Sequence, residues 1–120
     1  MRVIVTGGSG RAGTYIIAEL LAHGHSPSVT VDCSLANALK DPTRQEKVLR
    51  SVIRQRREGR RCLVGFMLES NIGPGRQEIP RRLADLAYGV SITDRCLDWE
   101  RTERVVRWAY GAVGEGVTAT

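Results

Sequence analysis

The chain has 120 residues, of which 42% are hydrophobic and 26% are charged. This length and composition indicate a single globular domain over residues 1–120. They exclude a complete eight-stranded β/α barrel, which needs about 250 residues, and a two-domain dehydrogenase, which needs more.

Basic residues exceed acidic ones by 18 to 13, which gives a formal charge of +5. One short run holds many of the arginines: Arg50, Arg54, Arg56, Arg57, Arg60 and Arg61. A dense basic run can attract phosphates or nucleic acid, but a solvated helix face followed by a turn is the expected structure. Because no aromatic residue interleaves with this run, we predict no nucleic-acid partner.

The three cysteines, Cys33, Cys62 and Cys96, show no CxxC spacing and lie near apolar segments. This usage is typical of reduced thiols in a cytoplasmic protein. We find no secretory signal, and the longest uncharged apolar run, residues 62–68, is much shorter than the ~20 residues that span a bilayer. We therefore expect a cytoplasmic protein with no membrane partner.

The predicted elements alternate between strand and helix along the chain. Short β-branched or continuous apolar runs predict the strands, and apolar residues at helical spacing predict the helices. In chain order we expect a strand over residues 3–5, a helix over 11–23, a strand over 29–31 that ends at Asp32, a helix over 43–58, a strand over 63–68, and a helix N-capped by Asp98 that runs to about residue 113.

Residues 70–93 are an expected long loop with a short helix near residues 81–86, and residues 114–120 are an expected frayed tail. The βαβαβα order predicts an α/β fold with a small three-stranded parallel sheet. The apolar run at residues 63–68 is typical of a strand covered on both faces, which favours an order that places it beside residues 3–5. The alternative order follows the chain and leaves one apolar face exposed.

A glycine-rich turn joins the first expected strand to the first expected helix. Residues 6–13 read TGGSGRAG, and such glycines let backbone N–H groups approach a pyrophosphate at a helix N-terminus. Asp32 ends the next strand, where a carboxylate can accept hydrogen bonds from a ribose. Gly7, Gly10, Gly13 and Asp32 are therefore candidates for binding NAD(P), the other interpretation being a turn that only joins strand to helix.

Residues 1–25 resemble the first βα unit of the extended short-chain dehydrogenases and nucleotide-sugar epimerases, whose turn reads TGGxGxxG. The resemblance implies a Rossmann-like segment and a small NAD(P)-binding module. Catalysis in that family uses a Tyr followed four residues later by a Lys. None of the three tyrosines has a Lys at that spacing, so the catalytic pair is absent and we assign no catalytic residue.

Four motifs farther along resemble a different family: VDCSLAN at residues 31–37, VGFMLESN at 64–71, GRQ at 75–77 and YGVSITDRCLDWE at 88–100. In this order they are similar to the C-terminal part of the type I 3-deoxy-7-phosphoheptulonate synthases (DAHP synthases), over residues 29–113. The resemblance implies the last two strands and helices of a TIM-type β/α barrel. It also implies the shikimate-pathway condensation of phosphoenolpyruvate with erythrose 4-phosphate, a step toward aromatic amino acids.

The same resemblance implies a divalent metal of the Mn, Fe or Co type. In the family the metal is held by an early Cys, by a His in the motif DxSHAN, and by a Glu and an Asp in the motifs ES and SITD. Glu69 and Asp94 match the last two ligands, but Leu35 stands in place of the His. Since a catalytic transition metal needs at least three protein ligands, we expect that the metal is not retained and that the chain alone is inactive.

The same resemblance to the DAHP synthases implies that the binding partners are phosphorylated small-molecule substrates. An exposed sheet edge or face would in addition allow association with a second copy or with a larger synthase. Three hypotheses thus stand side by side: a DAHP synthase-like fragment, an NAD(P)-binding module, and a fragment that acts by association.

Overall fold

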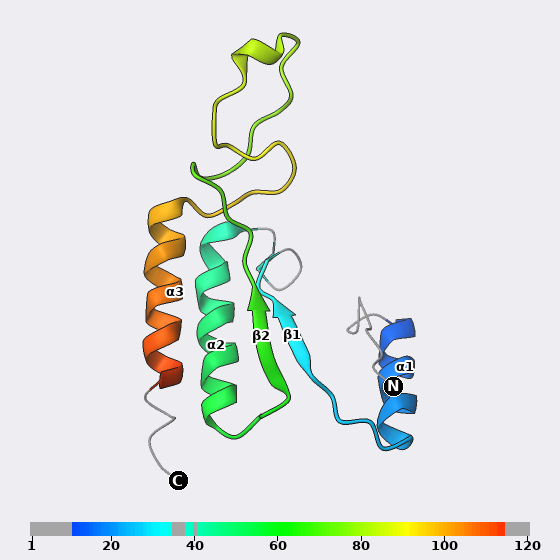
Figure 1. Ribbon diagram of the computed structural model, residues 1–120. Coiled ribbons are helices and arrows are strands. Elements are labelled where there is room, and N and C mark those ends of the chain that lie inside the picture. Colours follow the sequence, from blue (N-terminus) through cyan, green and yellow to red (C-terminus); the bar gives the residue numbers. More distant parts are fainter. Residues whose placement is uncertain (1–10, 35–37, 40, 115–120) are drawn as a thin grey trace.

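The computed structural model describes residues 11–34, 38–39 and 41–114. Within these residues, helices and strands alternate in a small α/β arrangement. The elements are α1 (Arg11–Ala22), β1 (Val29–Asp32), the 3-10 helix η1 (Pro42–Arg44), α2 (Gln45–Arg57), β2 (Leu63–Met67), the 3-10 helix η2 (Leu83–Asp85) and α3 (Trp99–Gly114) (Figure 1). The expected elements from residue 11 onward are therefore confirmed to within two residues at each end.

β1 and β2 form a parallel two-stranded sheet, in which Val31 pairs with Phe66 and Asp32 with Met67. The expected strand at residues 3–5 lies outside the described residues, so the third strand stays a prediction. The direct pairing of β1 with β2 shows that the favoured strand order is wrong. The crossover through α2 places β2 next to the strand that precedes it in the chain, as in a simple βαβ unit.

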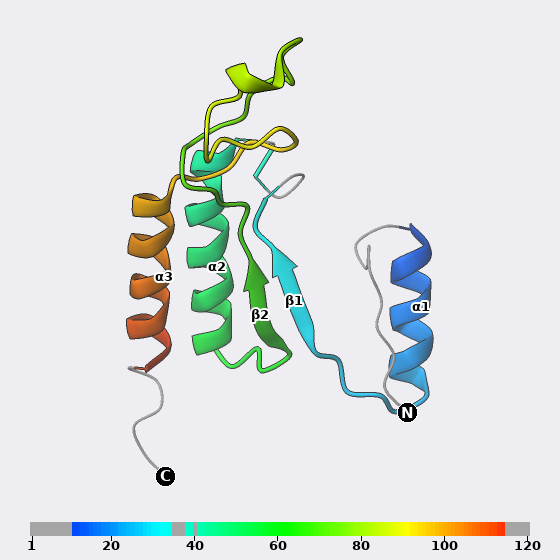
Figure 2. The ribbon, with the colours of Figure 1, turned by 45° about the horizontal axis from the view of Figure 1, so that its top comes forward.

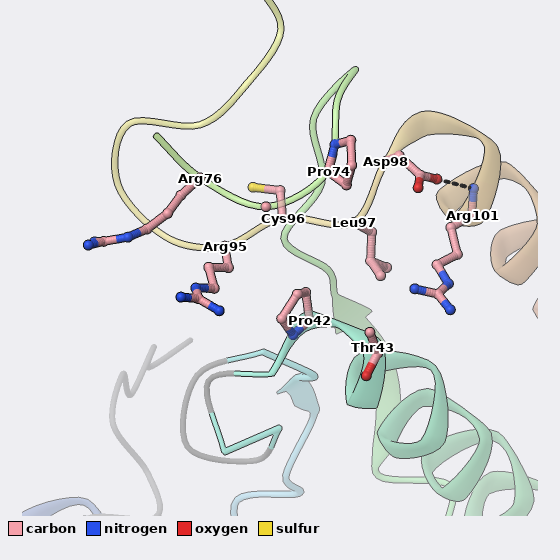
Figure 3. Close-up of a pocket in the computed structure, with 10 residues that line it drawn as sticks. Pro42, Thr43, Pro74, Arg76, Arg95, Cys96, Leu97, Asp98 and Arg101 are labelled. Carbon is pink, nitrogen blue, oxygen red and sulfur yellow. Dashed lines mark hydrogen bonds between the residues drawn. The ribbon is translucent and has the colours of Figure 1, made fainter. Parts of the chain in front are cut away.

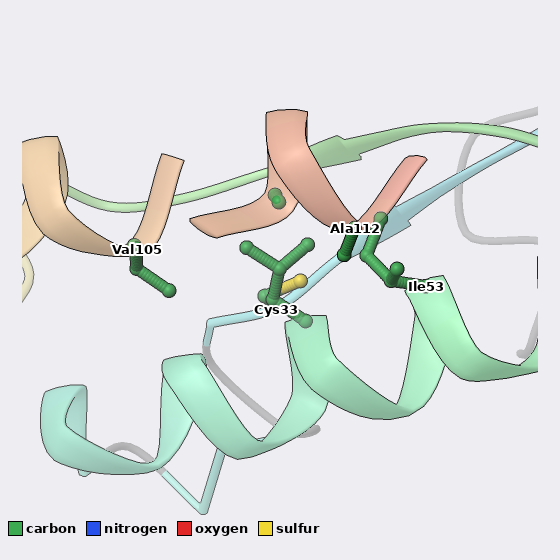
Figure 4. Close-up of a cluster of buried hydrophobic side chains, with 6 residues drawn as sticks. Cys33, Ile53, Val105 and Ala112 are labelled. Carbon is green, nitrogen blue, oxygen red and sulfur yellow. The ribbon is translucent and has the colours of Figure 1, made fainter. Parts of the chain in front are cut away.

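The hydrophobic core lies where α2 and α3 meet the sheet. Figure 4 shows Cys33, which follows β1, among side chains of both helices. Phe66 and Leu68 pack against this cluster from β2 and the residue after it. The buried members are Cys33, Leu49, Ile53, Val105, Ala109 and Ala112. Those in the helices recur at helical spacing, which is why both helices form as amphipathic elements.

Part of the strand at residues 63–67 is open to solvent. Val64 is 59% exposed and Met67 is 49% exposed, so the expectation of two-sided coverage is wrong for the described chain. The helices α2 and α3 lie together to one side of the strands, and no described helix packs as they do on the other side (Figures 1 and 2). This one-sided arrangement is the one found in a β/α barrel, where helices lie outside and the inner face looks into the barrel.

α1 stands apart from the sheet, on the β1 side, in both views (Figures 1 and 2). None of its side chains between residues 14 and 22 is buried, and Tyr15 is 77% exposed. A Rossmann-like unit packs its first helix on the sheet. The described residues therefore do not confirm a Rossmann-like unit in residues 1–25, because α1 is not covered by packing against the strands.

The basic run of α2 and the following turn is solvated, as expected. All six arginines from Arg50 to Arg61 are exposed. Arg50 pairs with Glu46 one turn earlier at 2.8 Å, and its guanidinium lies 4.0 Å from the ring centre of Trp108. The stacked pair joins α2 to α3 at the edge of the core.

The long loop between β2 and α3 is folded back on itself. Gly75 and Cys96 exchange two backbone hydrogen bonds, at 2.8 and 3.0 Å, which bring the beginning and the end of the loop together. The side chain of Gln77 donates to the carbonyls of Ala87 and Val90 and so braces the middle of the loop. In the described part of the chain, no helix has the length and apolar character that crossing a membrane requires.

Candidate functional site

The candidate site residues Asp32, Glu69 and Asp94, of which only the last two are candidate metal ligands, lie near the carboxyl ends of the two parallel strands. Asp32 is the last residue of β1, and Glu69 follows the end of β2 by two residues. The backbone N–H of Leu97 donates to the carbonyl of Glu69 at 2.9 Å, so the end of the long loop returns to this strand end and carries Asp94 with it. Strand pairing and loop folding thus bring Asp32, Glu69 and Asp94 to one edge of the sheet.

The carboxylate of Asp32 is engaged in the turn that follows β1. Its Oδ1 accepts a hydrogen bond from the backbone N–H of Ser34 at 2.8 Å and another from the Ser34 hydroxyl at 2.6 Å. This is the local bonding by which Asp stabilises a turn. A structural role for Asp32 is therefore visible in the contacts, beside the ribose-binding role expected from its position.

The backbone of Glu69 is held by the side chain of Gln45, the first residue of α2. The Gln45 amide donates to the carbonyl of Glu69 at 3.1 Å and accepts from its N–H at 2.8 Å. Gln45 is only 1% exposed. Because both polar groups of a buried amide are satisfied by one neighbouring residue, this contact fixes Glu69 relative to α2.

Electrostatic interactions confirm that the three carboxylates share one region. Burial raises the pKa of the Glu69 carboxyl, and the negative charges of Asp94 and Asp32 raise it further. Asp94 is itself exposed. Burial and the like charges nearby thus disfavour the charged form of Glu69.

A pocket of about 230 Å³ is lined by two of these three carboxylates, though not by Asp32, and by two arginines. Glu69, Asp94 and Asp41 line it together with Arg76 and Arg95, and Gln45 lines it at the start of α2. The two residues that match metal ligands therefore lie in one pocket, and the positively charged neighbours lie beside them.

The donor set does not fit the metal that the resemblance implies. In the part of the chain that the structure describes, no three His, Cys, Asp or Glu side chains form a group that could hold a metal ion. Position 35, where an imidazole is expected, is Leu and lies outside the described residues. Glu69 and Asp94, beside two guanidinium groups, are fewer than the three protein ligands that a catalytic transition-metal site uses.

The candidate nucleotide-binding residues are mostly outside the described part of the chain. Gly7 and Gly10 lie outside it, and Gly13 lies in the first turn of α1. Asp32, the remaining candidate, is placed by the structure beside Glu69 at the sheet edge. NAD(P) binding by these residues therefore stays a prediction.

Sequence reasoning missed the contribution of Gln45, and it assigned no role to Arg76 or Arg95. A signal for Gln45 was present, since it precedes Leu49 by four residues and so stands as a polar residue on the apolar side of α2. No local pattern marks the arginines, because they come together only through the folding of the long loop.

Comparison with known proteins places most of the chain in one family. Residues 15–107 match the model of the DAHP synthetase I family. The Tyr-sensitive phospho-2-dehydro-3-deoxyheptonate aldolase of Escherichia coli (strain K12) is 40% identical over 101 residues, which make up 84% of this chain and 28% of that protein. The corresponding protein of Enterobacter agglomerans is 43% identical over 89 residues, or 74% of this chain and 42% of that protein.

The fold agrees with the sequence match. The solved structure of phospho-2-dehydro-3-deoxyheptonate aldolase from Francisella tularensis SCHU S4 superposes with a TM-score of 0.73 and 32% identity, covering 87% of this chain and 30% of that chain. This chain thus spans less than half the length of these relatives.

The comparisons also correct the boundary between the two resemblances. The family match begins at residue 15, inside α1, and not at residue 29. Residues 15–25 of the segment that resembled an epimerase therefore lie within the family match, whereas the glycine motif at residues 6–13 precedes it, and the epimerase-like resemblance gains no support. With a family match over residues 15–107 and the fold of a solved relative, the chain belongs to the DAHP synthetase I family.

Proposed function

We propose that this chain supplies two neighbouring βα units of a DAHP synthase barrel, and that it takes part in condensing phosphoenolpyruvate with erythrose 4-phosphate only when further barrel units complete the site. The observation that carries this proposal is the parallel β1–β2 unit with Glu69 and Asp94 near its carboxyl edge. In β/α barrels the active site is built at that edge from several strands. Two strands supply only a part of it, so the chain alone is inactive.

We propose in addition that Glu69 and Asp94 hold no divalent metal tightly in this chain. Leu35 offers no donor, and the positive charges of Arg76 and Arg95 beside the carboxylates oppose the approach of a cation. A cytoplasmic location and phosphorylated substrates belong to the same proposal. NAD(P) binding through Gly7, Gly10, Gly13 and Asp32 is not proposed as a second function, because none of the comparisons reported above favours it.

An assay of the purified chain tests the expected inactivity. Consumption of phosphoenolpyruvate is followed with erythrose 4-phosphate and Mn²⁺, for the chain as it stands and for Leu35→His. We expect no turnover from either protein, because the imidazole restores one ligand but not the remaining barrel strands. Turnover by either protein would contradict the proposal that further barrel units are required.

A chimaera tests whether the segment is a functional part of a synthase barrel. Residues 15–107 replace the matching segment of the E. coli Tyr-sensitive enzyme, once with Leu35 and once with Leu35→His. We expect activity only from the chimaera with Leu35→His. Leu39→His, at a site that is 70% exposed in the same loop, is the matched control and should leave the chimaera inactive. A folded Leu35→His chimaera without turnover would refute the assignment of this segment to the synthase site.

A further inference from the structure

A second, larger pocket lies beside the carboxylate pocket, between the start of η1 and the end of the long loop. Its volume is about 380 Å³, which is in the range of small-ligand sites. Figure 3 shows Arg76 and Arg95 next to each other on one side of this pocket and Arg101, from the first turn of α3, on the other. We call these three residues the arginine set.

The arginine set gives this pocket an excess of positive charge. Among the described residues, Asp98 is the one carboxylate that lines it, and its Oδ1 already accepts a hydrogen bond from the backbone N–H of Arg101 at 2.7 Å. In the described part of the chain, the guanidinium groups of Arg95 and Arg101 form no ion pair or hydrogen bond. Their donors are therefore available to a ligand.

Arg76 is partly engaged, but its partners leave donors free. It pairs with Glu78, whose side chain is 83% exposed, and its Nη1 donates to the carbonyl of Thr93 at 3.4 Å. An exposed ion pair of this kind contributes little free energy, and a guanidinium carries five N–H donors. An incoming anion can thus share Arg76 with Glu78 at small cost.

The apolar walls of the pocket strengthen the attraction of its arginines for an anion. Leu97 and Cys96 are buried, at 2% and 6% exposure, and Pro42 and Pro74 add apolar surface. Charges act more strongly against such low-dielectric walls than in open solvent. The neighbouring carboxylate pocket shares Arg76 and Arg95 but adds the negative charges of Glu69, Asp94 and Asp41, so an anion is better accommodated among the arginine set.

We propose that the arginine set forms a binding site for the phosphate group of a small phosphate monoester. The planar guanidinium fork pairs with phosphate oxygens in a bidentate manner, and a phosphate carries close to two negative charges at neutral pH. The site uses neither Glu69 nor Asp94. It therefore holds whether or not the chain contributes to synthase chemistry, and it can fail or succeed independently of the proposed function.

Titration of the full chain with inorganic phosphate and with glycerol 3-phosphate, followed by calorimetry at fixed ionic strength, tests this site. We expect saturable binding of both probes. Arg95→Gln and Arg101→Gln should each weaken binding about tenfold, as expected for the loss of a charge-assisted hydrogen bond. Arg95→Lys keeps the charge but loses the fork, so it should fall between the unaltered chain and Arg95→Gln.

Two controls separate a built site from general attraction to a basic chain. Arg81→Gln removes an exposed arginine of the same loop, and Arg104→Gln removes an exposed arginine of α3, both outside the pocket. Neither should change phosphate affinity. Equal losses in these variants and in Arg95→Gln, the absence of saturable binding, or acetate binding as tightly as phosphate would each overturn the proposal.

Discussion

Gln45 and the backbone of Glu69 form a closed pair of hydrogen bonds, with the buried amide donating to the carbonyl at 3.1 Å and accepting from the N–H at 2.8 Å. The two residues are 24 positions apart and connect α2 to the end of β2. The contact therefore does two things at once. It holds α2 in register with the sheet, and it sets the position of a carboxylate at the edge where the candidate site lies.

Replacing Gln45 by Leu should lower the free energy of unfolding by roughly 2–4 kcal/mol. The backbone N–H of Glu69 would lose its acceptor, and the backbone carbonyl of Glu69 would lose one of its donors, in a buried setting. Urea denaturation followed by circular dichroism measures the change. Gln55→Leu on the same helix is the matched control, since Gln55 is half-buried and its side chain reaches Ser51 only at 3.4 Å. Similar losses of unfolding free energy in Gln45→Leu and Gln55→Leu would show that the contact between Gln45 and Glu69 adds no stability beyond that of an ordinary helix side chain.

What the sequence predicts well in this chain is what repeats locally. The apolar stripe of α2 and the N-cap at Asp98 are properties of a few neighbouring residues, and the structure confirms both, with Arg101 N–H bonded to the Asp98 carboxylate. The glycine-rich motif at residues 6–13 is equally local in the sequence. It is shared by many strand-to-helix connections, so it did not discriminate between families, whereas four ordered motifs did.

What escaped prediction depends on contacts between distant segments. The order of β1 and β2 depends on which strand edges meet, and neither strand shows this in its own residues. The arginine set forms because Gly75 and Cys96 pair across the long loop. α1 carries an apolar stripe but is exposed, for a similar reason. The periodicity of a helix shows which of its faces is suited to burial, but it does not show which surface covers that face.

The core between α2 and α3 should respond strongly to truncation. Leu49 is fully buried, so Leu49→Ala should cost about 2–5 kcal/mol of unfolding free energy from lost burial and the cavity left behind. Leu83→Ala in η2 makes the same chemical change at a site that is 69% exposed, and it should alter stability by about 0.5 kcal/mol or less. Urea denaturation measures both changes. Equal losses of unfolding free energy in Leu49→Ala and Leu83→Ala would contradict the assignment of Leu49 to the hydrophobic core.

Two glycines of the long loop separate backbone strain from steric clash. Gly75 and Gly89 both have positive φ, at 77° and 73°, so alanine at either position costs about 1–2 kcal/mol from the left-handed backbone. A Cβ on Gly89 would in addition lie 2.7 Å from Cβ of Ile72, whereas one on Gly75 would meet no atom of the described residues within 4 Å. Gly89→Ala should therefore destabilise the chain by at least about 1 kcal/mol more than Gly75→Ala. A smaller effect at Gly89 in thermal or urea unfolding would contradict this.

Cys33 should make the stability of the chain depend on alkaline pH. Burial and the neighbouring negative charge of Asp32 raise the pKa of the Cys33 thiol from 9.0 to about 11. Because the folded state then keeps the proton that the unfolded state loses, the stabilisation is complete below about pH 9 and is lost as the pH rises toward 11.

Urea denaturation under reducing conditions, repeated between neutral pH and about pH 11, measures this dependence. Cys33→Ala loses packing at every pH, but its stability should fall less steeply over the alkaline range than that of the unaltered chain. Cys62→Ala, at a half-buried site outside the core cluster, should keep the steep fall. Parallel curves for Cys33→Ala and the unaltered chain would show that ionisation of the Cys33 thiol is not linked to folding.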